Sequence, residues 1–158
     1  MIYVMLYLLS IIFANLLVHW FGIVTIGWLM FPAGAVVVGL TFSFRDFVQR
    51  EYGKWNCWIW MVIASIITYL FNQEIAVASV SAFLVSESVD WLMFTIMKGS
   101  FNKRIIVSNL IGIPLDSIIF VWLAFGLNFQ AILGQTIIKI LSSFILLIRP
   151  NILKIAFK

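Results

Sequence analysis

The sequence predicts an all-α integral membrane protein, built as a bundle of six transmembrane helices in a single domain covering residues 1–158. Hydrophobic residues make up 64% of the chain, only 10% of its residues are charged, and the mean hydropathy is +1.14. Soluble domains carry roughly 25% charged residues, so a soluble fold of this composition would lack polar surface. The apolar runs are long and unbroken, whereas a membrane β-barrel would alternate polar and apolar residues. Backbone in hydrocarbon must satisfy its own hydrogen bonds, which favours helices.

Six apolar runs approach the length of about 20 residues that a helix needs to cross a bilayer. The first run has no basic segment before it and no small-residue cleavage site after it, so we interpret it as a helix and not as a signal peptide. Pro32 and Gly34 interrupt the second run, and a charged segment, residues 45–54, is expected to follow it as a loop. The expected spans are about 2–21, 23–44, 55–72, 75–97, 105–127 and 130–148.

The basic residues predict how the chain is oriented. Nine of the ten Lys and Arg residues follow the second, fourth and sixth spans, and the loops on the opposite side contain none. By the positive-inside rule, both termini and the basic loops face the cytoplasm. We therefore expect a multi-pass protein of the cell inner (cytoplasmic) membrane. The nine residues are Arg45, Arg50, Lys54, Lys98, Lys103, Arg104, Arg149, Lys154 and Lys158.

Several kinds of chemistry find no support in the sequence. The single cysteine, Cys57, excludes an internal disulfide, and one Cys with one His gives no metal-ligand spacing. Neither a Gly-rich phosphate loop nor a GxSxG motif is present. We therefore expect no metal and no cofactor. We also expect no nucleic-acid partner, because the positive charge is placed as a topology signal. The expected partners are the lipid bilayer and a small molecule, and self-association into a homo-oligomer is left open.

Ionisable residues within the apolar spans are the candidate functional groups, because charge at membrane depth is costly. Glu87 and Asp90 lie in the fourth span, Asp116 in the fifth and Lys139 in the sixth, all near one depth. This arrangement is typical of a binding site at the membrane midplane. Fully ionised, three carboxylates would face one ammonium. Protonation, water, a cation or a donor-rich ligand is therefore needed to balance the site.

Helical spacing places further residues beside these groups. Asn109 shares a helix face with Asp116, and Gln135 lies four residues before Lys139. Phe83 and Trp91 flank the acidic face of the fourth span. A structural interpretation competes with the functional one: Lys139 can form an ion pair that only joins helices, and aromatic side chains in membrane helices usually just pack.

Four segments, in order along the chain, resemble the vitamin-uptake-like transporter family, also called the queuosine precursor transporter family. The match runs from about Phe31 to Lys139, which is most of the chain. Its segments are FPAG at 31–34 leading to RDFVQ at 45–49 and YG at 52–53, AVASVSAFLVSESVD at 76–90, SNLIG at 108–112 with DS at 116–117, and GQ at 134–135 with Lys139.

The resemblance implies an inner-membrane importer whose fold is similar to that of the substrate-binding subunits of energy-coupling-factor vitamin transporters. It implies a 7-deazaguanine-type base, such as preQ0, as the cargo. A carboxylate can accept hydrogen bonds from the ring N–H and the exocyclic amine of such a base together. Arg45 and Asp46, at the inner end of the second span, are then candidates for an inner gate. The implied substrate-binding residues are Glu87, Asp90, Asn109, Asp116, Gln135 and Lys139, with Phe83 or Trp91 stacking on the ring.

Three other interpretations stay open at this stage. The chain is alternatively a binding subunit for another base or vitamin that needs a separate energising partner, because nothing in it resembles an ATPase. It is otherwise a membrane scaffold without a ligand, or an intramembrane enzyme that uses paired carboxylates. The family pattern favours transport over catalysis, so we do not expect an enzyme.

Overall fold

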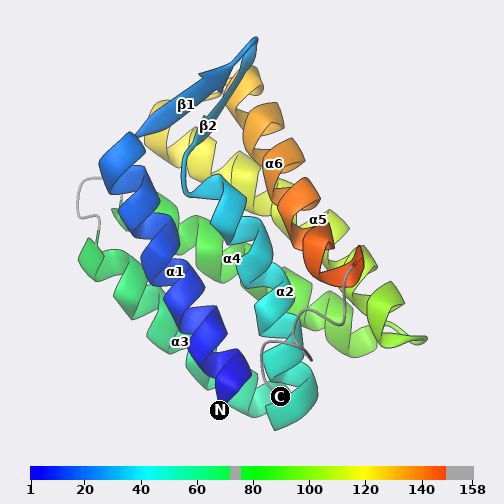
Figure 1. The fold of residues 1–158 in the computed structure, drawn as a ribbon. Helices are drawn as coiled ribbons and strands as arrows, with labels where there is room; N and C mark the ends of the chain where they lie inside the picture. Colours follow the sequence, from blue (N-terminus) through cyan, green and yellow to red (C-terminus); the bar gives the residue numbers. More distant parts are fainter. Residues whose placement is uncertain (72–75, 149–158) are drawn as a thin grey trace.

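The computed structural model describes residues 1–71 and 76–148 and is mostly helical, with one short β-hairpin (Figure 1). The expectation of a helical fold is confirmed, and five of the six predicted helices begin and end within four residues of their observed bounds. The 72–75 segment and the basic residues Arg149, Lys154 and Lys158 lie outside the described residues. The elements are α1 (Ile2–Phe21), β1 (Ile23–Ile26), β2 (Leu29–Pro32), α2 (Ala35–Tyr52), α3 (Lys54–Phe71), α4 (Ala76–Ile96), α5 (Phe101–Phe125) and α6 (Phe129–Ile148).

Three helices in the described part of the chain are long and apolar enough to cross a membrane. They are α1, residues 77–96 of α4, and α5, with 20, 20 and 25 residues. At 1.5 Å per residue, 20 residues span about 30 Å, the thickness of the hydrocarbon core. The chain is therefore a membrane protein, while the count of six spans stays a prediction.

The second predicted span is wrong in its first half. Residues 23–32 form an antiparallel hairpin, in which Ile23 pairs with Pro32 and Ile26 with Leu29. Gly27, at φ 61°, provides the left-handed residue that such a tight turn requires. The β-branched run before it suits a strand, and Pro32 cannot donate a helical hydrogen bond. A helix therefore begins only at Ala35.

The charged segment that was expected to be a loop is the second half of α2. This helix continues through residues 45–52 and ends at Tyr52, where Gly53 takes a positive φ of 83°. Arg45, Asp46 and Gln49 are buried against partners inside the bundle, while Arg50 and Glu51 in the last turn are exposed. The correction moves Arg45 and Asp46 from a membrane surface into the protein core, where both side chains are 0% exposed.

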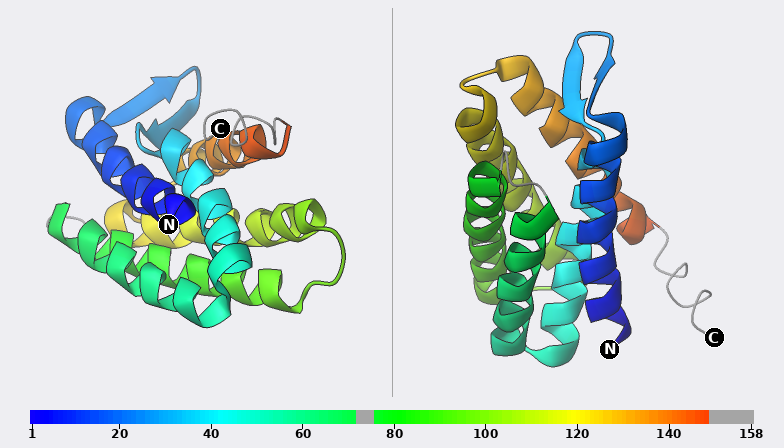
Figure 2. Two further views of the ribbon diagram at one scale, coloured as in Figure 1. Left: turned by 60° about the horizontal axis from the view of Figure 1, so that its bottom comes forward. Right: turned by 90° about the vertical axis from the view of Figure 1, so that its left-hand side faces the viewer.

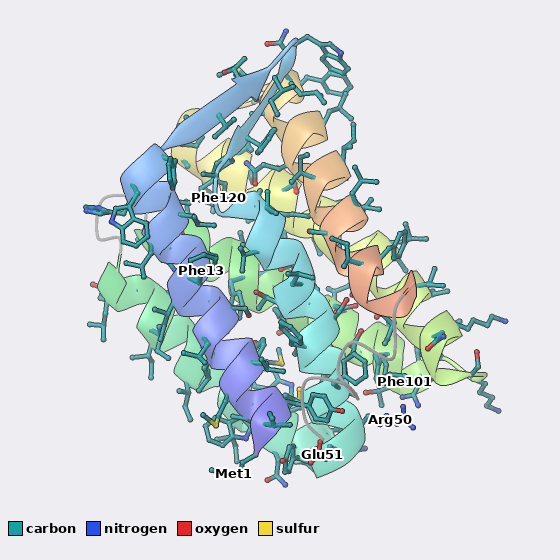
Figure 3. All side chains as sticks on the ribbon, viewed as in Figure 1. Met1, Phe13, Arg50, Glu51, Phe101 and Phe120 are labelled. Carbon is teal, nitrogen blue, oxygen red and sulfur yellow. The ribbon has the colours of Figure 1, made fainter. Side chains whose placement is uncertain are left out.

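The helices pack with α2 in contact with every other helix of the bundle (Figure 1). α4 packs between α3 and α5, while α1 and α6 lie along α2. The hairpin projects at the end of the bundle opposite the N-terminus, with β2 against α6 (Figure 2). Met1, Arg50, Glu51 and Phe101 lie at the other end (Figure 3). The Arg50 guanidinium lies 4.3 Å from the Phe101 ring centroid, so the two described basic connections share that end.

The polarity of the bundle is the reverse of that of a soluble protein. Large apolar side chains face outward on every helix, as with Phe13, Leu70 and Leu141, which are 49%, 66% and 62% exposed. Arg45, Glu87 and Asp90, in contrast, are 0% exposed. A surface of this kind suits hydrocarbon as the surrounding solvent, and it leaves the polar side chains to meet in the interior.

Candidate functional site

The buried polar side chains of the interior form two neighbouring groups. The Lys139 cluster consists of Ser86, Asp116, Gln135 and Lys139. The Arg45 cluster consists of Arg45, Asp46, Gln49, Glu87 and Asp90. α4 contributes to both clusters, because Ser86 belongs to the first and the next residue, Glu87, belongs with Asp90 to the second.

An ion pair between α5 and α6 is the centre of the Lys139 cluster. The Lys139 Nζ donates to Asp116 Oδ2 at 2.5 Å and to Gln135 Oε1 at 2.9 Å. The Ser86 hydroxyl donates to the other oxygen of Asp116 at 3.2 Å. Lys139 and Gln135 are four residues apart on α6, which places both on one helix face. Three helices thereby meet at a single carboxylate.

The Arg45 cluster surrounds one guanidinium with three carboxylates. Arg45 Nε donates to Glu87 Oε2 at 3.1 Å, and its Nη1 lies 2.9 Å from Asp46 Oδ1. Its Nη2 contacts Asp90 Oδ2, and Nη1 also donates to the Gln49 side chain at 2.9 Å. The fixed, planar fork of arginine suits contacts with several carboxylates. All of the charged side chains are 0% exposed.

Small residues let the helices approach closely enough for these contacts. A Cβ atom added at Gly112 on α5 would lie 2.8 Å from the Cβ of Asp90 on α4. Likewise, a Cβ at Gly39 on α2 would collide with the backbone oxygen of Lys139. The absence of a side chain at both positions therefore brings α4 to α5, and α2 to α6, at the depth of the two clusters.

A cavity of about 110 Å³ opens beside the Lys139 cluster. A water molecule takes up about 30 Å³ in the liquid, so the space is larger than a single hydration site. Its walls come from α1, β2, α2, α3, α4, α5 and α6. The lining residues are Ile11, Ala14, Asn15, Val18, Pro32, Gly34, Ala35, Val38, Thr41, Thr68, Ser79, Phe83, Asp116, Phe120, Gln135 and Lys139.

The structure divides the predicted substrate residues between the cavity and its surroundings. Phe83, Asp116, Gln135 and Lys139 line the cavity. The other four expected residues do not line it: Glu87 and Asp90 contact Arg45, the Asn109 amide donates to Ser43 at 3.2 Å, and the Trp91 indole donates to the Lys54 carbonyl at 3.0 Å.

Arg45 and Asp46 also differ from their expected place. Both were expected at the inner membrane surface, but the structure buries them beside α4 and α5. The Ser108 hydroxyl on α5 donates at 3.4 Å to Oδ2 of Asp46, the oxygen that does not contact Arg45. Burial is possible because acidic partners on α2 and α4 compensate the guanidinium.

Four polar cavity residues were not among the predicted site residues: Asn15, Thr41, Thr68 and Ser79. Asn15 donates one amide hydrogen to the Ile11 carbonyl at 2.9 Å, which leaves further hydrogen-bonding capacity on its side chain. Thr41 and Thr68 bond back to their own helices. A polar residue within an apolar run was the available signal, and Asn15 carries it most clearly.

The fold and the interior define a helical membrane protein with a polar, ion-paired cavity within its helix bundle. Residues 67–150, slightly more than half of the 158 residues, match the family model described as "putative vitamin uptake transporter". The chain therefore belongs to this uptake transporter family. The matched segment includes α4, α5 and α6, and with them the entire Lys139 cluster. No curated protein and no solved structure matched the chain.

Proposed function

We propose that this protein imports a 7-deazaguanine-type base, a precursor of queuosine such as preQ0, and binds it in the cavity beside Asp116 and Lys139. The observation that carries the proposal is the set of groups on the cavity wall. It combines a carboxylate, an ammonium, an amide and a phenyl ring in one small space. This set matches a flat heterocycle with donors on one edge and an acceptor on another.

Asp116 is the residue to which we assign the donor edge of the base. Each of its oxygens has one described partner, Ser86 or Lys139. A carboxylate oxygen has room for a second hydrogen bond, so Asp116 can accept a ring N–H and an exocyclic amine. Charge on the acceptor makes such bonds shorter and stronger than neutral ones.

Gln135 and Phe83 complete the proposed pocket. The Gln135 Nε2 is buried and has no hydrogen-bond partner among the described residues, so it is available to donate to a carbonyl on the base. Phe83 presents a ring for stacking, which contributes about 1–3 kcal/mol per base in nucleic-acid complexes. We leave Glu87, Asp90 and Asn109 out of the proposed pocket, because they do not line the cavity.

We further propose six spans with both termini and the basic connections in the cytoplasm, at the inner membrane. The basic connections after α2 and α4 share one end of the bundle, and the hairpin lies at the other (Figure 2). The hairpin, which contains no basic residue, would then face outward. The activity in this proposal is transport without catalysis.

Import can be tested in cells that neither make queuosine precursors nor carry their own importer. The cells receive a trace of preQ0 and express the chain, and queuosine in tRNA is measured. We expect queuosine to appear with the wild type and with Glu51→Gln, an exposed control, and to be lost with Asp116→Asn. Absence of queuosine with the wild type present in the membrane would refute the assigned cargo or require a partner. Uptake by purified chain in liposomes separates those two outcomes.

A further inference from the structure

The Arg45 cluster carries more negative charge than its guanidinium neutralises. Asp46, Glu87 and Asp90 together offer three carboxylates to one Arg45, and all four side chains are 0% exposed. Buried carboxylates are tolerated when they are paired, and an excess of them favours the protonated form. Nothing in the proposed binding of a base uses this cluster, because none of its members lines the cavity.

Unpartnered polar atoms lie at the same place. One oxygen of Glu87, one of Asp90 and the hydroxyl of Tyr7 are buried without a hydrogen-bond partner in the described part of the chain. Tyr7, on α1, is 0% exposed and lies beside Glu87. Buried polar groups normally find partners, and a proton shared among these three atoms would give them one.

Glu87 faces ionisable groups from several helices. The groups that face it are Tyr7 from α1, Arg45 and Asp46 from α2, Cys57 from α3, Asp90 on α4 itself, and Asp116 from α5. Asp116 belongs to the Lys139 cluster, so Glu87 is also the electrostatic link between this site and the cavity.

We propose that Glu87, with Asp90 as its partner, is the proton-binding site that couples import to the proton gradient; this inference rests on the proposed function. One proton enters from the cavity side and adds to a carboxylate oxygen of Glu87. The same proton leaves toward the cytoplasmic end, past Asp90 and Gln49. Gln49 donates to Thr95 at 2.7 Å, so polar contacts continue from Arg45 toward that end of α4. Each cycle moves one base and one proton inward.

The adjacency of the two clusters supplies the coupling. A base that donates hydrogen bonds to Asp116 competes with Lys139 for that carboxylate. When the ammonium is drawn away, the negative field at Glu87 strengthens and Glu87 binds its proton more tightly. By linkage, the bound proton strengthens binding of the base to the same degree. Substrate and proton are therefore carried together.

A proton suits the cluster better than a metal cation. The guanidinium of Arg45 already occupies the centre and would repel a second cation. Among the described residues, no group of three or more His, Cys, Asp or Glu is placed to hold a metal ion. A proton needs no coordination space and would give Glu87 a donor for the Tyr7 oxygen.

The test uses the full chain purified into liposomes with radiolabelled preQ0. Two activities are measured: exchange of internal for external base without a gradient, and concentration of base under an inside-alkaline gradient of one pH unit. One proton per base permits at most about tenfold concentration under this gradient. We expect the wild type and Glu51→Gln to show both activities. Glu87→Gln should keep exchange at a comparable rate and lose concentration.

The outcomes separate the inference from the function beneath it. Two results overturn the inference and leave the function standing, provided that the wild type exchanges base. In one, Glu87→Gln concentrates the base as well as the wild type does. In the other, only a sodium gradient drives concentration of the base. Loss of exchange in folded Glu87→Gln also overturns it, because Glu87 would then bind the base. If this variant fails to fold, Asp90→Asn takes its place under the same criteria. No exchange by the wild type removes both proposals.

Discussion

Two variants of the ion pair between Asp116 and Lys139 distinguish a structural bridge from a binding site: one replaces only Lys139, and the other replaces both residues. Lys139→Met keeps the length of the side chain and removes its charge, which leaves Asp116 buried without a cation. Removing one partner of a buried pair costs about 3–5 kcal/mol. The Lys139 and Asp116 side chains are 4% and 9% exposed, and the adjacent cavity has room for water. We therefore expect about 3 kcal/mol, the lower end of that range.

The double variant Asp116→Asn with Lys139→Met should recover most of this loss. The new amide can still accept from Ser86 and bond to Gln135, while no charge is left unpaired. Replacing a whole buried pair is often neutral or stabilising. For a chain of this size, 1 kcal/mol shifts Tm by about 2–4 °C, so the single variant should melt about 6–12 °C below the wild type and the double variant close to it.

Thermal unfolding in detergent and uptake of preQ0 are measured on the same preparations. Our assignment predicts that the double variant regains stability without regaining uptake, because the base has lost its carboxylate. Recovery of both would show that the pair only joins α5 to α6 and would refute the assigned role of Asp116. A single variant that melts with the wild type would refute the energetic argument.

Three further predictions concern packing, charge and topology. Gly112→Val should destabilise the protein by about 1–3 kcal/mol, seen as a lower Tm, because the added side chain meets Asp90; an unchanged Tm would mean that α4 and α5 separate freely. Arg45→Met should cost about 3–5 kcal/mol and lower the yield of folded protein more than Arg45→Lys does, and equal yields would show that the charge is dispensable. In a variant without the native cysteine, an impermeant thiol reagent should label Thr25→Cys on intact cells and Lys98→Cys only after lysis; the reverse pattern would invert the proposed orientation.

The sequence allowed most helices to be predicted because lipid imposes a simple rule on them. A long apolar run must be helical in hydrocarbon, and the bounds of α1, α3, α4 and α6 follow the runs closely. The hairpin was not predicted, because the residues of Ile23–Ile26 are as apolar as those of a transmembrane helix and adjoin another apolar run. Only the tight turn at Gly27 and the pairing with β2 identify it as a strand.

The candidate site was predictable in part for a similar reason. Charges in apolar runs, such as Asp116 and Lys139, stand out in the sequence, and the depth of their spans predicted that they lie near each other. The sequence did not distinguish Asp116 from Glu87 as the partner of Lys139, and the structure shows the pair with Asp116. Arg45 did not stand out, because a basic residue after an apolar run usually marks a membrane surface. Its burial depends on carboxylates that arrive from α4, more than forty positions later in the chain, and spacing along one helix carries no information about them.

The dependence of α2 on α4 has a consequence for biogenesis. Helices enter the bilayer as the ribosome delivers them, and Arg or Asp at the centre of an inserting helix costs about 2.5–3.5 kcal/mol each. α2 carries Arg45, Asp46 and Gln49 and is not among the described helices that are apolar enough to cross alone. It therefore has no stable place in lipid until Glu87 and Asp90 have been synthesised. In the proposed six-span arrangement, we expect α2 to insert together with α4 and not before it.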